Sequence, residues 1–140
     1  MANELPAPVR AFLGEQRFAV LATINPDGTA QQTVMWYELR DDRIVMNTAL
    51  GRIKGQNLLR DPRISICIEN GYQYVTIAGT AQLNDDQAIA QEDIRRLAIR
   101  YHGPTEGARQ AIEQFSKQRR VSIYLPFERV ILNGFDDHQH

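Results

Sequence analysis

Short runs of apolar and β-branched residues, separated by turn signals, recur along the first third of the chain. Residues 18–24 read FAVLATI and end at NPDG, a sequence typical of a tight turn. Residues 30–39 and 43–48 are further runs of this kind, separated by RDD. β-branched and aromatic residues in runs bounded by turn residues favour strands joined as hairpins. The pattern therefore predicts three antiparallel strands before residue 50.

A second group of strands is predicted in the middle and near the end of the chain. Residues 63–69 and 74–83 are apolar runs joined by NGY, a good hairpin signal. The last run covers residues 120–132 and contains Pro126. Proline has no backbone N–H to donate to a neighbouring strand, so we expect an edge position or a bend there. Six strands in all are expected.

Helical spacing of apolar residues appears in three places. A short helix is predicted over about residues 51–61. Its end is marked by an Asp-Pro pair, because the residue before a proline disfavours the helical conformation. A longer helix is expected after an N-cap at Asn84 or Asp85, and another over about residues 105–117. Mostly antiparallel strands with helices inserted late predict an α+β, mainly β fold, namely a six-stranded antiparallel barrel with short flanking helices.

The length and charge of the chain narrow the classes of protein. Its 140 residues suit one domain, which we expect to cover residues 1–140. The net charge of −1 provides no general field for nucleic acid or an acidic membrane. No run approaches the roughly 18 apolar residues of a membrane span, and the first residues lack a signal-peptide pattern. We therefore expect a cytoplasmic protein that binds neither nucleic acid nor membrane.

Metal sites and nucleophilic catalysis find little support in the sequence. Cys67 is the only cysteine and lies in an apolar run, so we expect it to be buried, and it can form neither an internal disulfide nor a thiolate zinc site. His102, His138 and His140 lack the spacing of a metal site. No GxSxG, GxGxxG or P-loop motif is present. The sequence thus predicts no metal and identifies no catalytic residue.

Positive charge is concentrated in one short segment, residues 50–63. The segment has a local charge of +3, so the rest of the chain carries −4. Arg52 and Lys54 stand where the predicted short helix begins, and the first backbone N–H groups of a helix lack partners. Cations at such a point can hold a phosphate. On spacing alone, such cations on a short helix are more often just a solvated face, and both interpretations remain open.

Three stretches of sequence carry a resemblance to a known family. The segment TALGRIKGQNLLRDPRISICI, preceded by FAVLATINPDGTAQQTVMWYEL and followed by YQYVTIAGTAQL, resembles the pyridoxamine 5′-phosphate oxidase-like, FMN-binding split β-barrel family. It is most similar to the deazaflavin branch, which binds coenzyme F420. The resemblance covers about residues 18–83 and the closing strand. It implies a homodimer with cofactor sites between subunits, and hydride transfer between reduced F420 and a small organic acceptor of the conjugated-carbonyl or tetrapyrrole type.

The resemblance also implies roles for particular residues. Arg52 and Lys54 would hold the cofactor phosphate, and Asn57 would support that loop or contact the ligand. Two tyrosines from the other subunit would close the pocket, although ordinary barrel packing explains them equally well. The residues implied to bind the cofactor are Gln31, Thr33, Val34, Thr48, Arg52, Lys54, Asn57, Tyr72 and Tyr74.

One departure from the family pattern bears on the choice of cofactor. Flavin-binding members resemble R-x-V-L-L-K on the second strand, whereas this chain has QTVMWY, so that Gln32 and Tyr37 replace both cations. Each charge-assisted contact is worth roughly 1.5–3 kcal/mol, and its loss should weaken a compact flavin phosphate most. F420 is therefore favoured, with an FMN enzyme as one alternative and a non-enzymatic binder of the cofactor, a bilin or haem as another. Met35 and Trp36 are expected in the substrate pocket.

Overall fold

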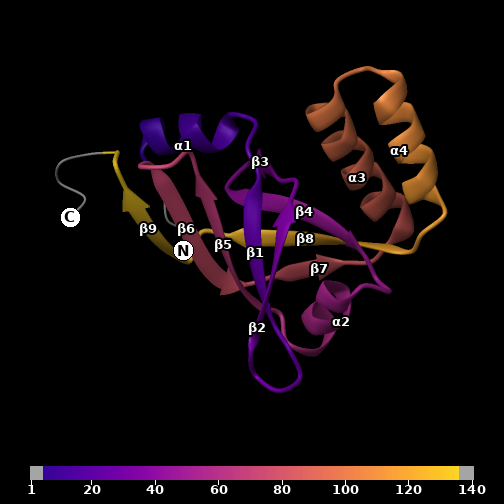
Figure 1. Cartoon of the computed structure of the whole chain (residues 1–140), viewed down its shortest axis with the longest axis horizontal. Helices are drawn as coiled ribbons and strands as arrows, with labels where there is room; N and C mark the ends of the chain where they lie inside the picture. Colours follow the sequence, from indigo (N-terminus) through magenta and orange to yellow (C-terminus); the bar gives the residue numbers. More distant parts are fainter. Residues whose placement is uncertain (1–4, 136–140) are drawn as a thin grey trace.

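The computed structural model describes residues 5–135 (Figure 1). Residues 1–4 and 136–140, which include His138 and His140, lie outside this part of the chain. The elements in chain order are α1 (Ala7–Gly14), β1 (Ala19–Ile24), β2 (Ala30–Met35), β3 (Glu38–Arg40), β4 (Arg43–Ala49), α2 (Ile53–Arg60), β5 (Arg63–Glu69), β6 (Tyr74–Thr80), β7 (Gln82–Asn84), α3 (Gln87–His102), α4 (Glu106–Ser116), β8 (Arg120–Pro126) and β9 (Arg129–Asn133).

The strands form two antiparallel sheets that pack against each other. One sheet has the order β2-β1-β5-β6-β9 and the other the order β3-β4-β8-β7. This arrangement confirms the predicted α+β, mainly β class. The predicted number of six strands is wrong, because residues 5–135 contain nine. Three of the predicted runs each break into two strands, and each broken run passes from one sheet to the other (Figure 1).

The breaks are corners of the barrel. They fall at Trp36 and Tyr37 between β2 and β3, at Ala81 between β6 and β7, and at Phe127 between β8 and β9. The side chains of Tyr37, Ala81 and Phe127 are buried, so the apolar pattern continues through each corner. Pro126 ends β8 at such a corner, which confirms the predicted bend, but β8 itself lies between β4 and β7 and is not an edge strand.

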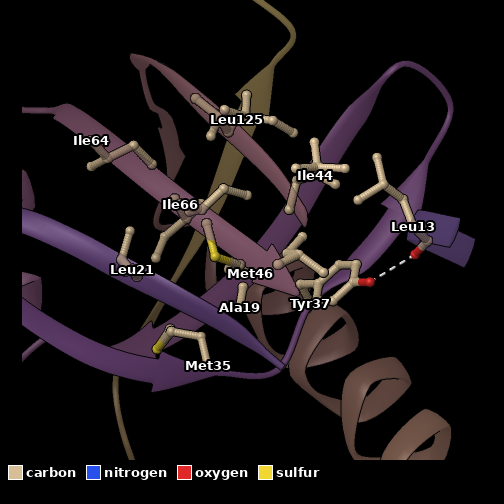
Figure 2. Packing of buried hydrophobic residues seen from close by; sticks show 14 of the residues in the cluster. Leu13, Ala19, Leu21, Met35, Tyr37, Ile44, Met46, Ile64, Ile66 and Leu125 are labelled. Carbon is tan, nitrogen blue, oxygen red and sulfur yellow. Dashed lines mark hydrogen bonds between the residues drawn. The ribbon is translucent and has the colours of Figure 1, made fainter. Parts of the chain in front are cut away.

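Side chains from both sheets meet in one core. Figure 2 shows Leu21 and Ile66 of the larger sheet facing Ile44 and Leu125 of the smaller one. Cys67 alternates with the buried isoleucines of β5 and is only partly buried, so the expectation that it would be buried was wrong. A half-buried strand hides every second residue, and Cys67 lies on the outward side.

Helix α1, which the apolar pattern did not predict, covers one end of the barrel. Val9, Phe12 and Leu13 are buried, and the hydroxyl of Tyr37 donates a hydrogen bond of 2.9 Å to the carbonyl of Leu13 (Figure 2). The ring of Phe12 packs edge-on against Phe135 at 5.0 Å. An eight-residue helix offers barely two turns of periodicity, and its stability comes from this packing.

Helix α3 packs against β4 and β8 on the outer face of the four-stranded sheet, and α4 packs beside α3 (Figure 1). The N-cap of α3 is Asp86, whose side chain accepts hydrogen bonds from the amides of Ala88 and Ile89. The predicted caps, Asn84 and Asp85, are therefore wrong, because Asn84 still belongs to β7. None of the helices formed by residues 5–135 is long and apolar enough to cross a membrane.

Candidate functional site

The first turn of α2 presents positive charge that no acidic side chain balances. Arg52 is the N-cap and has an extended backbone, and its side chain makes no capping hydrogen bond. The first helical hydrogen bond runs from the amide of Gln56 to the carbonyl of Arg52. The amides of Ile53, Lys54 and Gly55 therefore lack helical acceptors, and the first turn contains no acidic residue. This helix end is suited to an anion.

Close packing at Gly55 holds α2 in this position. A Cβ atom at Gly55 would lie 2.8 Å from the carbonyl oxygen of Ala49 and 3.0 Å from that of Leu50. Both atoms belong to the backbone of the segment that leads from β4 into the helix. Only glycine lets the helix approach this segment so closely. The position of the free amides therefore depends on Gly55.

We expect Gly55→Ala to lower the free energy of unfolding by about 1–2 kcal/mol, because the overlap with backbone outweighs the gain in helix propensity. Gly51→Ala is a matched control, since a Cβ atom at Gly51 would meet nothing within 4 Å. The control should change stability by less than about 0.5 kcal/mol. Urea denaturation of both variants measures the difference, and equal losses would contradict the packing argument.

Two adjoining hollows share Arg52 and Lys54. The first, which we call the β2–α2 hollow, has a volume of about 400 Å³ and is lined by Gln31, Thr33, Gly51, Arg52, Ile53 and Lys54. The second, the α3–α4 hollow, has a volume of about 210 Å³ and lies between β2, β4 and the two long helices. Because Arg52 and Lys54 line both, the hollows adjoin at these two side chains, and we call them together the groove.

Six of the nine predicted site residues line this groove: Gln31, Thr33, Val34, Thr48, Arg52 and Lys54. They come from β2, β4 and the start of α2, which are separate in sequence. Met35 and Trp36, expected in the substrate pocket, line the α3–α4 hollow as well. The fold therefore gathers most of the predicted residues in one place.

Asn57 lies outside the groove. Its side chain is 2% exposed and donates hydrogen bonds to Thr23 Oγ1 at 3.1 Å and to Asn25 Oδ1 at 3.0 Å. Its side-chain Oδ1 accepts a hydrogen bond of 3.0 Å from Arg60 Nη2. These bonds tie α2 to β1 and to the following turn. Of the two roles predicted for Asn57, support of the phosphate loop is the one that its contacts fit.

Tyr72 and Tyr74 line neither hollow. Tyr72 stands in the turn before β6 and is 73% exposed, and Tyr74 begins β6. Strand β6 is three places from β2 in the order of the five-stranded sheet. Their predicted part in the site therefore requires a second copy of the chain.

Arg120 is a groove residue that the sequence did not reveal. It starts β8 and pairs with Ala49, which places it beside the first turn of α2. Its side chain is only 5% exposed, although it is charged. The guanidinium donates to Asn47 Oδ1 at 2.7 Å and to Gln118 Oε1, and it lies 4.5 Å from the centre of the Phe115 ring. Arg120 follows Lys54 by 66 residues in the sequence, and the antiparallel pairing of β8 with β4 brings it to the groove.

No carboxylate of residues 5–135 forms an ion pair with Arg52, Lys54 or Arg120. Burial, together with the charge of Arg52, lowers the pKa of Arg120 to about 10. Burial and the charges of Arg52 and Arg120 also lower the pKa of Lys54. Three mutually repelling cations around one groove make an electrostatic site that an anion would relieve.

A chain of polar side chains supports the guanidinium of Arg120 from behind. Asn47 Nδ2 donates to Ser122 Oγ at 3.3 Å, and Ser122 Oγ donates to Asp93 Oδ2 at 2.6 Å. Asp93 is 3% exposed and also accepts from Tyr124 Oη at 2.6 Å and from Arg40 Nη1 at 2.8 Å. Burial alone would raise the pKa of Asp93, but these hydrogen bonds outweigh it, so the pKa is lowered.

The far wall of the α3–α4 hollow is aromatic. Trp36 stacks on Tyr101 at 5.2 Å and meets Phe115 edge-on at 6.1 Å. The ring of His102 also packs edge-on against Trp36, at 5.3 Å. Within residues 5–135 no three His, Cys, Asp or Glu side chains lie together as metal ligands. This wall suits a flat organic group.

The two positions where the chain departs from the flavin pattern both lie outside the groove. Gln32 is exposed on the side of β2 opposite to Gln31 and Thr33. Tyr37 is completely buried at a barrel corner, and burial raises its pKa to about 12. Neither residue places a charge near Arg52 or Lys54.

Comparisons with known proteins match this architecture. A chain described as a conserved hypothetical protein of Mycobacterium tuberculosis has 28% identity over 96% of this chain and 87% of its own, with a TM-score of 0.79. An F420 reductase has 21% identity over 90% and 98%, with a TM-score of 0.72. A putative pyridoxamine 5′-phosphate oxidase of Listeria innocua has 16% identity over 89% and 94%, with a TM-score of 0.65.

The last two structural similarities, at 21% and 16% identity, show a shared fold only, whereas a match to a family model shows family membership. The model of the pyridoxamine 5′-phosphate oxidase family matches residues 5–130, which include every strand but the last residues of β9. The match covers the barrel, the phosphate-binding candidates and Arg120. The chain belongs to the pyridoxamine 5′-phosphate oxidase family.

Proposed function

We propose that this chain is an oxidoreductase that binds coenzyme F420 and transfers a hydride between the reduced cofactor and a small organic acceptor, such as a conjugated carbonyl or a tetrapyrrole. The observation that carries the proposal is the groove itself, where Arg52, Lys54 and the free amides of α2 converge without a balancing carboxylate. Membership of an oxidoreductase family and the likeness to a solved F420 reductase favour the same function.

The residues of the groove fit a phosphate-bearing cofactor. Arg52 and Lys54 would hold the phosphate of the cofactor, and the amides of the first helical turn would donate to its oxygens. Thr48 faces the same cations from β4. Gln31, Thr33 and Val34 all lie on β2 and would contact the edge of the ring.

When bound, reduced coenzyme F420 supplies the hydride, and solvent supplies the proton that completes reduction of the acceptor. The chain provides placement, because it holds the phosphate at one point and the ring along one strand. We assign no proton donor among its side chains.

F420 is favoured over FMN by the exposure of the cation Arg52 at the mouth of the groove. The neutral side chains of Gln32 and Tyr37 lie outside the groove and do not bear on this choice. The phosphate of F420 is a diester that continues into a glutamate tail, and this tail can reach exposed groups beyond the groove. Arg52 is exposed at the mouth, where such a tail would leave.

The active form in this proposal is a homodimer. A row of outward-facing residues crosses the five-stranded sheet in register: Val34, Val20, Cys67, Thr76 and Ile131. Val34 and Ile131 are 67% and 65% exposed. A second copy covering this apolar row would remove it from water. Because Val34 also lines the groove, the partner would meet the site, and its Tyr72 or Tyr74 could close it.

Titration of the purified chain with coenzyme F420, FMN and haem, side by side, tests the proposal. We expect F420 to bind most tightly, to a species with twice the 16.0 kDa mass of the chain by light scattering. Protein from a host that lacks F420 should be colourless. A yellow protein that releases flavin on heating would instead indicate an FMN enzyme. Tight F420 binding without hydride transfer to any conjugated carbonyl would indicate a binding protein.

A further inference from the structure

We propose that Arg120 forms a second anion site, at the inner end of the α3–α4 hollow, that takes a small flat reactant bearing one carboxylate. The existence of the site follows from the geometry of this chain. Its assignment as the substrate site of the enzyme rests on the proposed function.

Arg120 differs from the other two cations in how it can be reached. Arg52 is exposed at the mouth shared by the two hollows, whereas Arg120 is 95% buried, as its 5% exposure shows. The phosphate of F420 lies in the middle of that molecule, between the ribityl chain and the tail. The phosphate therefore needs a binding position from which the cofactor can continue in both directions. The enclosed Arg120 can be met only by a terminal group.

One edge of the guanidinium is available to such a group. Nε and Nη1 are occupied by Asn47 and Gln118, and one face lies against Phe115. Nη2 has no hydrogen-bond partner among residues 5–135, and it is not among their fully buried unpaired atoms. Asn47 and Gln118, which accept from the other two nitrogens, are neutral amides, so the positive charge of Arg120 remains unbalanced. A carboxylate of one negative charge would balance it.

The other residues that line the hollow indicate what kind of molecule would carry the carboxylate. Trp36, Phe115 and Ile94 supply flat or apolar wall, and Thr48 supplies one hydroxyl. A volume of about 210 Å³ admits one substituted ring. The combination favours an aromatic or conjugated monocarboxylate.

The guanidinium is held in place before any ligand arrives. Asn47, which orients Nε, is itself fixed through Ser122 to the buried Asp93. A preoriented donor binds an anion without the cost of ordering a long side chain. An arginine that is simply solvated at the surface would not need these supporting hydrogen bonds.

Benzoate and its neutral isostere benzamide are the probes. Trp36 is the only tryptophan of the chain and lines the hollow, so its fluorescence reports occupancy, with calorimetry as a second measure. We expect benzoate to bind the wild type and benzamide to bind about tenfold more weakly or worse, because one charge-assisted contact is lost. Arg120→Gln should lose about tenfold or more for benzoate, and Arg120→Lys should retain part of the affinity.

Circular dichroism checks that each variant is folded, and Arg120→Lys keeps the test decisive should the glutamine variant unfold. Coenzyme F420 should not displace benzoate, and Arg120→Lys, which keeps the charge, should weaken binding of benzoate more than binding of F420. Absence of benzoate binding, equal binding of benzamide, equal binding to both Arg120 variants and the wild type, or displacement by F420 would overturn the inference. Benzoate binding that depends on Arg120 in a chain that fails to bind F420 would support the site and reject the proposed function.

Discussion

Replacement of Asp93 by alanine is expected to lower the free energy of unfolding by about 3–5 kcal/mol, since it breaks a buried ion pair. Asp93 accepts from Arg40, Ser122 and Tyr124 while only 3% exposed. The variant leaves the two hydroxyls without their acceptor inside the protein, and Arg40 retains only Glu38 as a partner. Urea denaturation with linear extrapolation measures the loss.

Glu92→Ala provides the matched control for this prediction. Glu92 precedes Asp93 on α3, but its side chain is 52% exposed in an ion pair with Arg95. Its loss should cost about 0.5 kcal/mol or less. Equal destabilisation by the two variants would show that the buried network does not stabilise the fold as described.

The effect of Asp93 should also depend on pH, with a definite sign. The pKa of Asp93 in the folded protein is lowered relative to the unfolded value of about 3.9. Its stabilisation is therefore fully present above pH of about 4 and is lost as pH falls through the folded-state pKa. The difference in stability between the wild type and Asp93→Ala should accordingly shrink in acid below about pH 4.

Arg52→Ala and Lys54→Ala are each expected to weaken binding of coenzyme F420 by roughly tenfold to a hundredfold. A charge-assisted contact contributes roughly 1.5–3 kcal/mol, and about 1.4 kcal/mol corresponds to a factor of ten. The fold should remain intact, because neither side chain forms an ion pair within residues 5–135. Fluorescence titration with F420 and far-ultraviolet circular dichroism give the two readouts.

Arg95→Ala removes an equal charge from the outer surface of α3, where Arg95 pairs with Glu92 at 2.9 Å. It controls for the general effect of net charge on an anionic ligand. If the dissociation constants of the Arg52 and Lys54 variants equal that of the wild type, the phosphate site is assigned to the wrong residues. A loss as large in Arg95→Ala would point to a diffuse charge effect.

Local sequence was sufficient where a feature depends on neighbours along the chain. Residues 63–69 were predicted as a strand and form β5, because alternation and turn residues act over a few positions. The short helix near Arg52 was predicted from its Asp-Pro end, and it ends at Arg60. The first turn, at Gly28, has the positive φ that its sequence indicates.

Corners and caps required more than local pattern. The run 74–83 is uninterrupted in sequence, yet it breaks at Ala81 because the chain must cross from one sheet to the other. The buried residue Ala81 continues the apolar pattern, so no turn signal such as Asn-Gly marks the break. Asp86 caps α3 in place of Asn84, because pairing with β8 extends β7 to Asn84.

Residues close together in the sequence were enough to predict the mainly β class, the concentration of cations around Arg52 and Lys54, and the motif shared with the family. The folded arrangement was needed to show that Arg120 lines the groove and that Asn57 ties α2 to β1. The physical reason is the range of the interactions. Turns, helix ends and charge clusters depend on residues close in sequence. The buried Arg120, in contrast, reaches the groove only because β8 pairs with β4.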